Sequence, residues 1–313
     1  SKGAAEVRKF RDDELVNRVI LLSDGRANVG PKSPRELTRL GRSLVKEGIS
    51  VSTLGLGLGY NEDLMSGLAS AGSGNHIFVE EEEDLVAVYN NAFNDLMSVV
   101  AGDFEIHARV AKGVRPVRVL GTDADIKGQD IYIPLAQLYA SQQRYFVLEV
   151  EVDAGEAGTS RPLVSVNVEY HNMITETTDK LSSKVKIRFA EAIAEVQEDL
   201  DHETYAYCAL QIANERNIRA TALRDAGQIE EAKKLLSKNV DELHEFAEIC
   251  KENDVDFVVP ELELSIETNR NQVEWVESAD WNRSRKAMRA TQSEVKSQQT
   301  MSSRSKSILG SGK

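Results

Sequence analysis

One acidic residue near the start of the chain has a setting that suits ligand or metal binding. Asp24 follows an uninterrupted apolar run, Val19 to Leu22, and is flanked by Ser23 and Gly25. A short apolar run that ends in turn residues is typical of a parallel strand buried on both faces. Open α/β folds bind their ligands where the carboxyl ends of such strands meet. We therefore expect the Asp24 carboxylate at the ligand-binding edge of a sheet.

The loop around Asp24 has a structural interpretation beside the ligand-binding one. Ser23, Gly25 and Asn28 all shape it, and Asn28 can order it by hydrogen bonding to nearby backbone, as in Asx turns. Asp24 can cap a turn in the same way. Mg²⁺ requires several oxygen ligands in an octahedral array, so one carboxylate cannot hold it. We favour the structural role for Asn28 and retain Asp24 as a metal-site residue of a domain that has further ligands.

A glycine-rich run invites a second hypothesis, dinucleotide binding. Gly55, Gly57 and Gly59 follow an apolar strand, but they lack the G-x-G-x-x-G spacing of a dinucleotide site. We predict a tight strand-to-helix turn instead. The acidic run from Glu80 to Asp84 suits the positive end of a helix better than a cation site.

Catalytic motifs are weak in this chain. Ser70 and Ser73 precede His76, but the G-x-S-x-G nucleophile motif is absent. His76 opens a predicted strand, where packing or an edge position is the usual role. The histidines are scattered without metal-ligand spacing. We expect no enzyme, and a hydrolase is the minority hypothesis.

Several segments together resemble the von Willebrand factor type A domain. The residues from Val16 to Gly30 match the strand-DG-x-x-N-x-G pattern of its third metal-site loop. The segments Glu47 to Gly59, Leu68 to Val79 and Glu82 to Val99 resemble its next strand, its closing helix-loop-strand and its last helix. Among such proteins, the bacterial calcium-activated chloride channel homologues are the most similar type, because a β-rich region follows their type A domain.

The resemblance implies a metal site of which this chain has only a part. In the family, the residue at the position of Asp24 helps to bind Mg²⁺, and an acidic residue of a protein partner completes the coordination. The family's Asp-x-Ser-x-Ser loop and metal-site Thr have no counterpart before position 16. The resemblance therefore implies a type A domain that lacks its N-terminal part, with Mg²⁺ in the intact domain and none bound by this chain alone.

The resemblance also bears on partners and location. It implies a first strand that is absent here, which would leave the Val19 to Leu22 strand unpaired on one side. Another chain, a second copy or an upstream segment would then complete the sheet. The family slightly favours the bacterial periplasm or cell surface, and the cytoplasm stays open.

Composition argues against nucleic acid and membranes as partners. The 313-residue chain has a net charge of −13 and 41% hydrophobic residues, which supports ordinary packed cores. Its last part, from Arg283 to Lys313, has eight basic residues and one acidic residue, so the rest of the chain is strongly acidic. An acidic body repels nucleic acid and anionic lipid. No apolar stretch approaches the ~18 residues of a membrane span, and two cysteines are too few for a disulfide scaffold.

Hydrophobic periodicity predicts the organisation of the chain. Strands alternate with helices over residues 1–100, which predicts a partial doubly wound parallel sheet of the type A, Rossmann-like kind. Apolar residues then alternate with a period of two over 101–189, which predicts an antiparallel β-sandwich. Residues 190–260 read as a helical hairpin, with one helix over 190–226 and a second over 229–250. A helix to about Met288 and a flexible basic tail are expected over 261–313.

Together these patterns predict an α/β chain for protein–protein recognition or adhesion. The alternative is a structural component of a larger assembly. Which partner it binds does not follow from the sequence.

Overall fold

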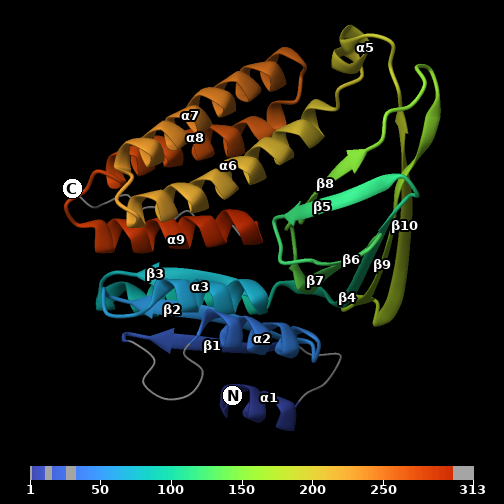
Figure 1. The fold of residues 1–313 in the computed structure, drawn as a ribbon. Helices are drawn as coiled ribbons and strands as arrows, with labels where there is room; N and C mark the ends of the chain where they lie inside the picture. Colours follow the sequence, from blue (N-terminus) through green and yellow to red (C-terminus); the bar gives the residue numbers. More distant parts are fainter. Residues whose placement is uncertain (1, 11–15, 26–32, 299–313) are drawn as a thin grey trace.

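The structure, a computed structural model, describes residues 2–10, 16–25 and 33–298. In Figure 1 the chain passes from a parallel sheet at the bottom, through a β-sandwich at the right, to a group of helices at the top. This mixed α/β architecture confirms the predicted fold class.

The parallel sheet contains the apolar run that precedes Asp24. Its strands β1 (Asn17–Ser23), β2 (Ile49–Leu56) and β3 (Ser73–Val79) lie in the order β1-β2-β3, and both neighbouring pairs are parallel. All but the last residue of β2 are buried, because helices cover both faces of this central strand.

Helices flank this parallel sheet on both faces. They are α1 (Lys2–Lys9), α2 (Pro34–Val45), α3 (Glu62–Ala71), the short 3₁₀ helix η1 (Glu82–Asp84) and α4 (Leu85–Leu96). Ser33 and Glu36 form a capping box at the start of α2. Apolar side chains of α1, α2 and α3 pack on one face of the sheet, and those of α4 pack on the other.

The β-sandwich follows directly from α4. Its strands are β4 (Val99–Val110), β5 (Val114–Leu120), β6 (Asp125–Lys127), β7 (Asp130–Tyr139), β8 (Val147–Val152), β9 (Ser160–Asn172) and β10 (Thr177–Arg188). They form one sheet in the order β10-β9-β4-β7-β6 and a smaller one from β5 and β8. Neighbouring strands are antiparallel. Alternate residues of both sheets form the core between them, as the period of two predicts.

The C-terminal part is helical, as the sequence patterns predict, but it is divided into more helices. It contains α5 (Ile193–Glu198), α6 (His202–Asp225), α7 (Ile229–Glu252), the 3₁₀ helix η2 (Asp256–Val258), α8 (Val259–Trp275) and α9 (Trp281–Ser297). The turn between α6 and α7 contains Gly227, with φ +82°, a value that favours glycine. The predicted hairpin is present, but α8 and α9 extend it.

Two helix predictions need correction. The single helix expected over 190–226 is interrupted, because the Asp201 side chain accepts a hydrogen bond from the Thr204 N–H at 3.0 Å and starts α6 afresh. The single helix expected after Pro260 is two helices, α8 and α9, and Asp280 caps the second of them.

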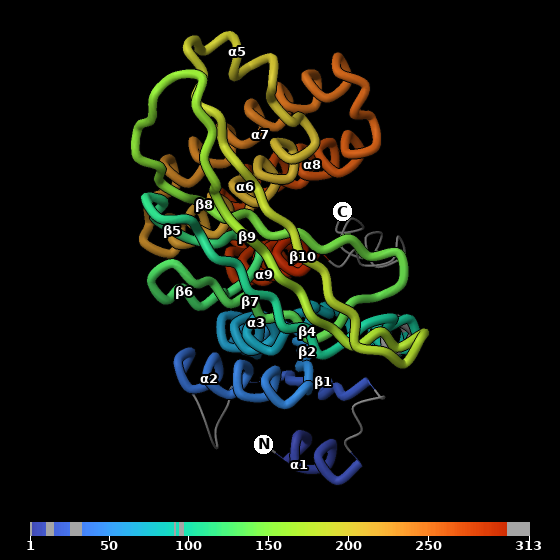
Figure 2. The backbone as a smooth tube through the Cα atoms, turned by 90° about the vertical axis from the view of Figure 1, so that its right-hand side faces the viewer, coloured from blue at the N-terminus to red at the C-terminus, as the bar shows by residue number. Residues whose placement is uncertain are grey.

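The basic C-terminal part is ordered to Gln298, whereas we expect flexibility from about Thr291. Gln292 and Ser293 are buried, and α9 lies between the parallel sheet and the other helices in both Figure 1 and Figure 2. The physical reason is a set of ion pairs, described below, that composition alone does not predict. The remainder of the expected tail, 299–313, lies outside the described residues.

The parallel sheet has one edge that no described strand covers. β1 pairs with β2 on one side only, and its residues Leu21 and Leu22 are 38% and 48% exposed. In the part of the chain that the structure describes, no helix combines the length and apolar character of a transmembrane span.

Candidate functional site

The loop that contains Asp24 lies at the carboxyl end of β1, beside the loop from β2 to α3. The Ser23 hydroxyl donates to the Gly25 carbonyl at 2.9 Å, and the Asp24 side chain is exposed. A Cβ on Gly59 would lie 2.5 Å from the Asp24 carbonyl oxygen. Only glycine therefore allows the two loops to lie this close, at the edge of the sheet where the sequence predicts Asp24.

The described residues at this edge do not form a complete Mg²⁺ site. Nowhere in the described ranges do three His, Cys, Asp or Glu side chains gather as metal ligands. Asp24 offers one carboxylate, and the Ser23 hydroxyl is used within the loop. Mg²⁺ requires more oxygens than these two residues supply. The metal role of Asp24 stays a prediction for a domain with further ligands, and Asn28 lies outside the described residues.

The glycine run forms the predicted strand-to-helix turn. A Cβ on Gly55 would lie 2.1 Å from the Tyr60 ring, so that ring packs directly on the strand backbone. Gly57 has φ +64°. The turn leads into Asn61, whose side chain accepts from the Leu64 N–H at 3.1 Å and caps α3. The glycines thereby hold the start of α3 against the sheet.

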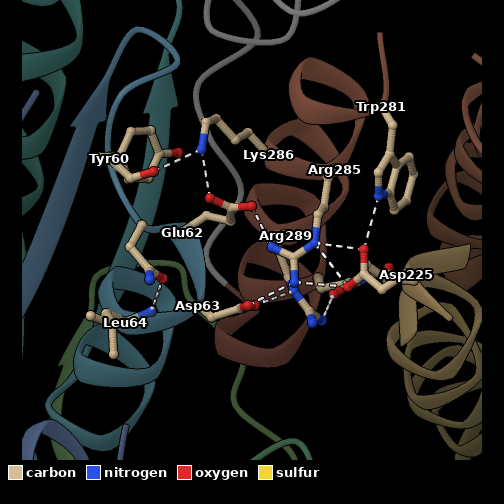
Figure 3. Close-up of polar contacts among 12 residues, drawn as sticks. Tyr60, Glu62, Asp63, Leu64, Asp225, Trp281, Arg285, Lys286 and Arg289 are labelled. Atoms are coloured by element: carbon tan, nitrogen blue, oxygen red, sulfur yellow. Dashed lines mark hydrogen bonds and ion pairs between the residues drawn. The ribbon is translucent and has the colours of Figure 1, made fainter. Parts of the chain in front are cut away.

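At the start of α3, two carboxylates meet cations from the far end of the chain (Figure 3). Arg285 of α9 pairs with Glu62 and contacts Asp63 at 2.7 Å and Asp225 at 2.9 Å. Arg289 donates to Asp63 at 2.9 Å. The cluster thus joins the parallel sheet unit, α6 and α9.

Lys286 is the most deeply buried member of this cluster, with a side chain that is 1% exposed. Its Nζ donates to the Tyr60 carbonyl at 2.8 Å and to Glu62 at 2.5 Å, and it lies 4.4 Å from the centre of the Tyr60 ring. Burial alone would raise the pKa of Glu62, but hydrogen bonds from Lys286 and Arg285 hold that pKa below its usual range. The Lys286 ammonium is buried and paired within the protein, so it holds α9 against the start of α3 and is not accessible to a substrate.

His76 is a core residue. It is 3% exposed; its Nδ1 lies 3.0 Å from the Thr53 hydroxyl and its Nε2 lies 3.3 Å from the Tyr60 hydroxyl. Burial lowers the pKa of His76 to about 4, so the ring is neutral at neutral pH. The hydroxyl of Ser70 donates to Asp123 at 3.0 Å, so its contact is with a carboxylate and not with His76.

The acidic run and the basic helix form further contacts that the sequence patterns miss. Glu80 pairs with Arg283, at the start of α9, at 2.5 Å, and the Ser293 hydroxyl accepts from the His76 N–H at 3.3 Å. One signal was present in the sequence, because Arg285 and Arg289 are four residues apart and lie on one face of a helix. Their shared partner Asp63 lies more than 200 positions away, and no local pattern identifies it.

Solved structures with a similar fold include two type A proteins. Von Willebrand factor type A from Catenulispora acidiphila has a TM-score of 0.67 and 14% identity, over 94% of this chain and 69% of that one. The ArnB paralog VWA2 from Sulfolobus acidocaldarius has a TM-score of 0.51 and 19% identity, over 93% and 67%. Human COPII-coat protein Sec24c has a TM-score of 0.53 and 12% identity, over 94% and 41%. At these identities the comparison establishes a type A-like fold.

Sequence comparison gives a shorter match. No protein-family model matches the chain. An uncharacterised Escherichia coli (strain K12) protein, YfbK, is 30% identical over 89 residues, which is 28% of this chain and 16% of that protein. The chain therefore aligns with only a small part of this relative, and neither the chloride channel homologue type nor the truncated type A domain follows from the match.

Proposed function

We propose that this chain is a protein-recognition module within a multi-protein assembly and performs no catalysis. The type A-like fold supports this proposal, because two of the similar structures are type A proteins and a third is a coat protein. The observation that carries the proposal is an exposed apolar face beside an open sheet edge.

The exposed apolar face follows α4 and the residue after it. Val86, Tyr89, Phe93 and Met97 are 69%, 50%, 53% and 77% exposed. Their spacing of three or four residues places them on one side of the helix, while Val88 on its other side is buried against the sheet. A row of large apolar side chains in contact with water is typical of a protein-binding surface.

The open edge of β1 belongs to the same region, because Ile20 of β1 packs with Leu85 and Val88 of α4 in one apolar cluster. An uncovered strand edge presents backbone donors and acceptors to another strand. We define the α4 face together with Leu22 and the open backbone edge of β1 as the recognition surface. A separate protein or a second copy of the chain would cover it and extend the sheet.

Site-specific photo-crosslinking of the full chain tests this proposal. A benzophenone amino acid at Tyr89 should crosslink to one defined protein band in the source cell, and Phe93→Arg should abolish that band. The matched control is Phe257, which is 62% exposed on η2 in a different part of the molecule. Crosslinking at Phe257 should be absent, and Phe257→Arg should leave the Tyr89 band unchanged.

Chelation separates recognition from a purely structural role. This arm uses a longer chain that carries the further metal ligands: loss of its crosslinked band in EDTA would support Mg²⁺-dependent recognition in which Asp24 takes part, whereas a band that survives EDTA would support the alternative, a structural component. Equal crosslinking at Tyr89 and Phe257 would refute the recognition surface. Substrate turnover that is lost on Asp24→Ala or His76→Ala would favour a hydrolase instead.

A further inference from the structure

The strand β10 of the β-sandwich contributes no residue to the sandwich core. The five-stranded sheet ends at β10, which pairs with β9 on one side and with no described strand on the other. The apolar cluster between the two sheets contains residues of β4, β5, β7, β8 and β9 and of the loops beside them, but none of β10. Figure 1 shows β10 at the right-hand margin of the molecule. The sheet therefore ends in an open strand of 12 residues.

The inner face of β10 is apolar and uncovered. Leu181 lies opposite Val168 of β9, and Val185 lies opposite Val164, which packs in the core. Directly opposed residues of an antiparallel pair lie on the same face of the sheet, so Leu181 and Val185 lie on the core side. They are nevertheless 58% and 46% exposed. The reason is that the facing sheet has only two strands, β5 and β8, and does not cover β10.

The outer face of β10 is basic. Lys180, Lys184 and Lys186 alternate with the inner residues along the strand, and all three are exposed. Lys180 pairs with Glu169 of β9 at 2.7 Å. Lys184 and Lys186 form no ion pair with any residue that the structure describes. Two ammonium groups at this edge can therefore pair with carboxylates of an added strand.

A second copy of this chain does not match the edge. In a symmetric antiparallel pair centred on Ser183, Lys180 of each copy would lie opposite Lys186 of the other, and like charges in that position are destabilising. Lysine on an open edge is also one way in which proteins prevent pairing with their own copies. The edge favours a strand of different sequence, with acidic residues opposite the lysines of β10.

We propose that β10 binds an extended segment of a separate protein in which apolar and acidic residues alternate. The segment adds a strand to the sheet through backbone hydrogen bonds, a recurring mode of peptide recognition. Because successive side chains of a strand lie on opposite faces, its apolar residues cover Leu181 and Val185 while its acidic residues face Lys184 and Lys186. The recognition surface at α4 and β1 is a different interface, so this proposal does not depend on it.

Binding is tested by fluorescence anisotropy of the full chain with two labelled peptides, VEVEVEV and VKVKVKV. The acidic peptide should bind about tenfold more tightly than the lysine peptide, and less tightly as salt is added. The net charge of −13 alone would favour the lysine peptide, so this preference reports the local charge of β10. The acidic peptide should also slow deuterium exchange of the backbone amides of 177–188 but not of 125–127, the opposite edge of the sheet. No binding of the acidic peptide, or equal binding of the two peptides, refutes the proposal.

Variants of the full chain locate the peptide. Lys184→Glu combined with Lys186→Glu should weaken binding of the acidic peptide about tenfold and reverse the preference between the two peptides. The matched control is Lys127→Glu, since Lys127 is exposed on β6 at the opposite edge of the same sheet. Leu181→Ser should weaken binding about fivefold. Its control is Ile174→Ser, in the turn beyond the strand, where the side chain is 76% exposed.

Two results would overturn the assignment to β10. Unchanged binding in both Leu181→Ser and the double lysine variant, with circular dichroism unchanged, would place the peptide elsewhere. Self-association of the chain that is lost in Leu181→Ser, measured by sedimentation velocity, would show that a second copy occupies the edge. Self-association that is lost only in Phe93→Arg would concern the recognition surface and leave β10 open to the acidic segment, as proposed.

Discussion

The edge near Asp24 and the interface of α3 with α9 differ in how their residues are distributed along the chain. Ser23, Asp24 and Gly25 are consecutive and follow a strand, so their position at the sheet edge could be predicted locally. Glu62, Asp63, Lys286 and the arginines of α9 are contributed by segments more than 200 residues apart. The edge presents an exposed carboxylate, whereas the interface buries a paired lysine.

This difference assigns the two regions different tasks. An exposed carboxylate on a loop contributes little to folding and is available for binding. A buried lysine destabilises the folded state when its partners are removed. The pairing of Lys286 with Glu62 therefore couples α9 to the parallel-sheet unit. Four substitutions test this division, in order of decreasing expected effect.

Lys286→Met should lower the free energy of unfolding by about 3–5 kcal/mol, because it removes the more deeply buried of the two cations that pair with the Glu62 carboxylate. Urea denaturation followed by circular dichroism measures this. Arg283→Met is the matched control, since its ion pair with Glu80 is partly exposed and should be worth at most about 1 kcal/mol. Equal losses in the two variants would show that burial of the pair is unimportant.

His76 should make stability depend on pH between about 6.5 and 4. Its folded pKa is lowered to about 4, whereas the unfolded value is about 6.5. Above pH 6.5 both states are neutral and the residue has no pH effect. As pH falls below 6.5 the unfolded state binds the proton first, so stability decreases by up to about 3 kcal/mol near pH 4 and then levels off. His76→Gln should flatten this part of the curve; an unchanged slope would contradict the assignment to His76.

Gly59→Ala should lower the free energy of unfolding by about 1–3 kcal/mol, because its Cβ would lie 2.5 Å from the Asp24 carbonyl and force the two loops apart. Gly67→Ala is the control. No atom lies within 4 Å of a Cβ at that helical position, so alanine should stabilise α3 by about 0.5–1 kcal/mol. Thermal melts of both variants compare the two effects. A neutral Gly59→Ala would show that the loops need not lie so close.

Asp24→Ala should have the smallest effect on folding, within about 0.5 kcal/mol, because the side chain is exposed. Titration calorimetry of this chain with Mg²⁺ should give no binding heat, with or without the substitution. Mg²⁺ binding by this chain that is lost in Asp24→Ala would show that the ligands supplied by the chain suffice. That result would show that this edge of the sheet is a complete metal site.

Much of the fold could be predicted because its signals are local. The apolar run ending at Asp24 predicts a buried parallel strand, and the alternation around Phe104 to Val110 predicts a strand with two different faces. The Ser33 capping box marks the start of α2. Each signal lies within one turn or one strand, where sequence neighbours are also spatial neighbours. The interruption at Asp201 was missed because an aspartate can lie within a helix or cap its start, and periodicity does not distinguish the two.

The sequence alone determined the order of sheet, sandwich and helices, and the position of Asp24 at the end of its strand. Only the tertiary structure decided that His76 is a core residue and that the basic residues of α9 pair with acids of α3. It also decided that Leu181 and Val185 of β10 are left exposed on the core side of the sandwich. The physical reason is that burial and ion pairing depend on contacts between distant segments, whereas strand, helix and turn propensities act over a few residues.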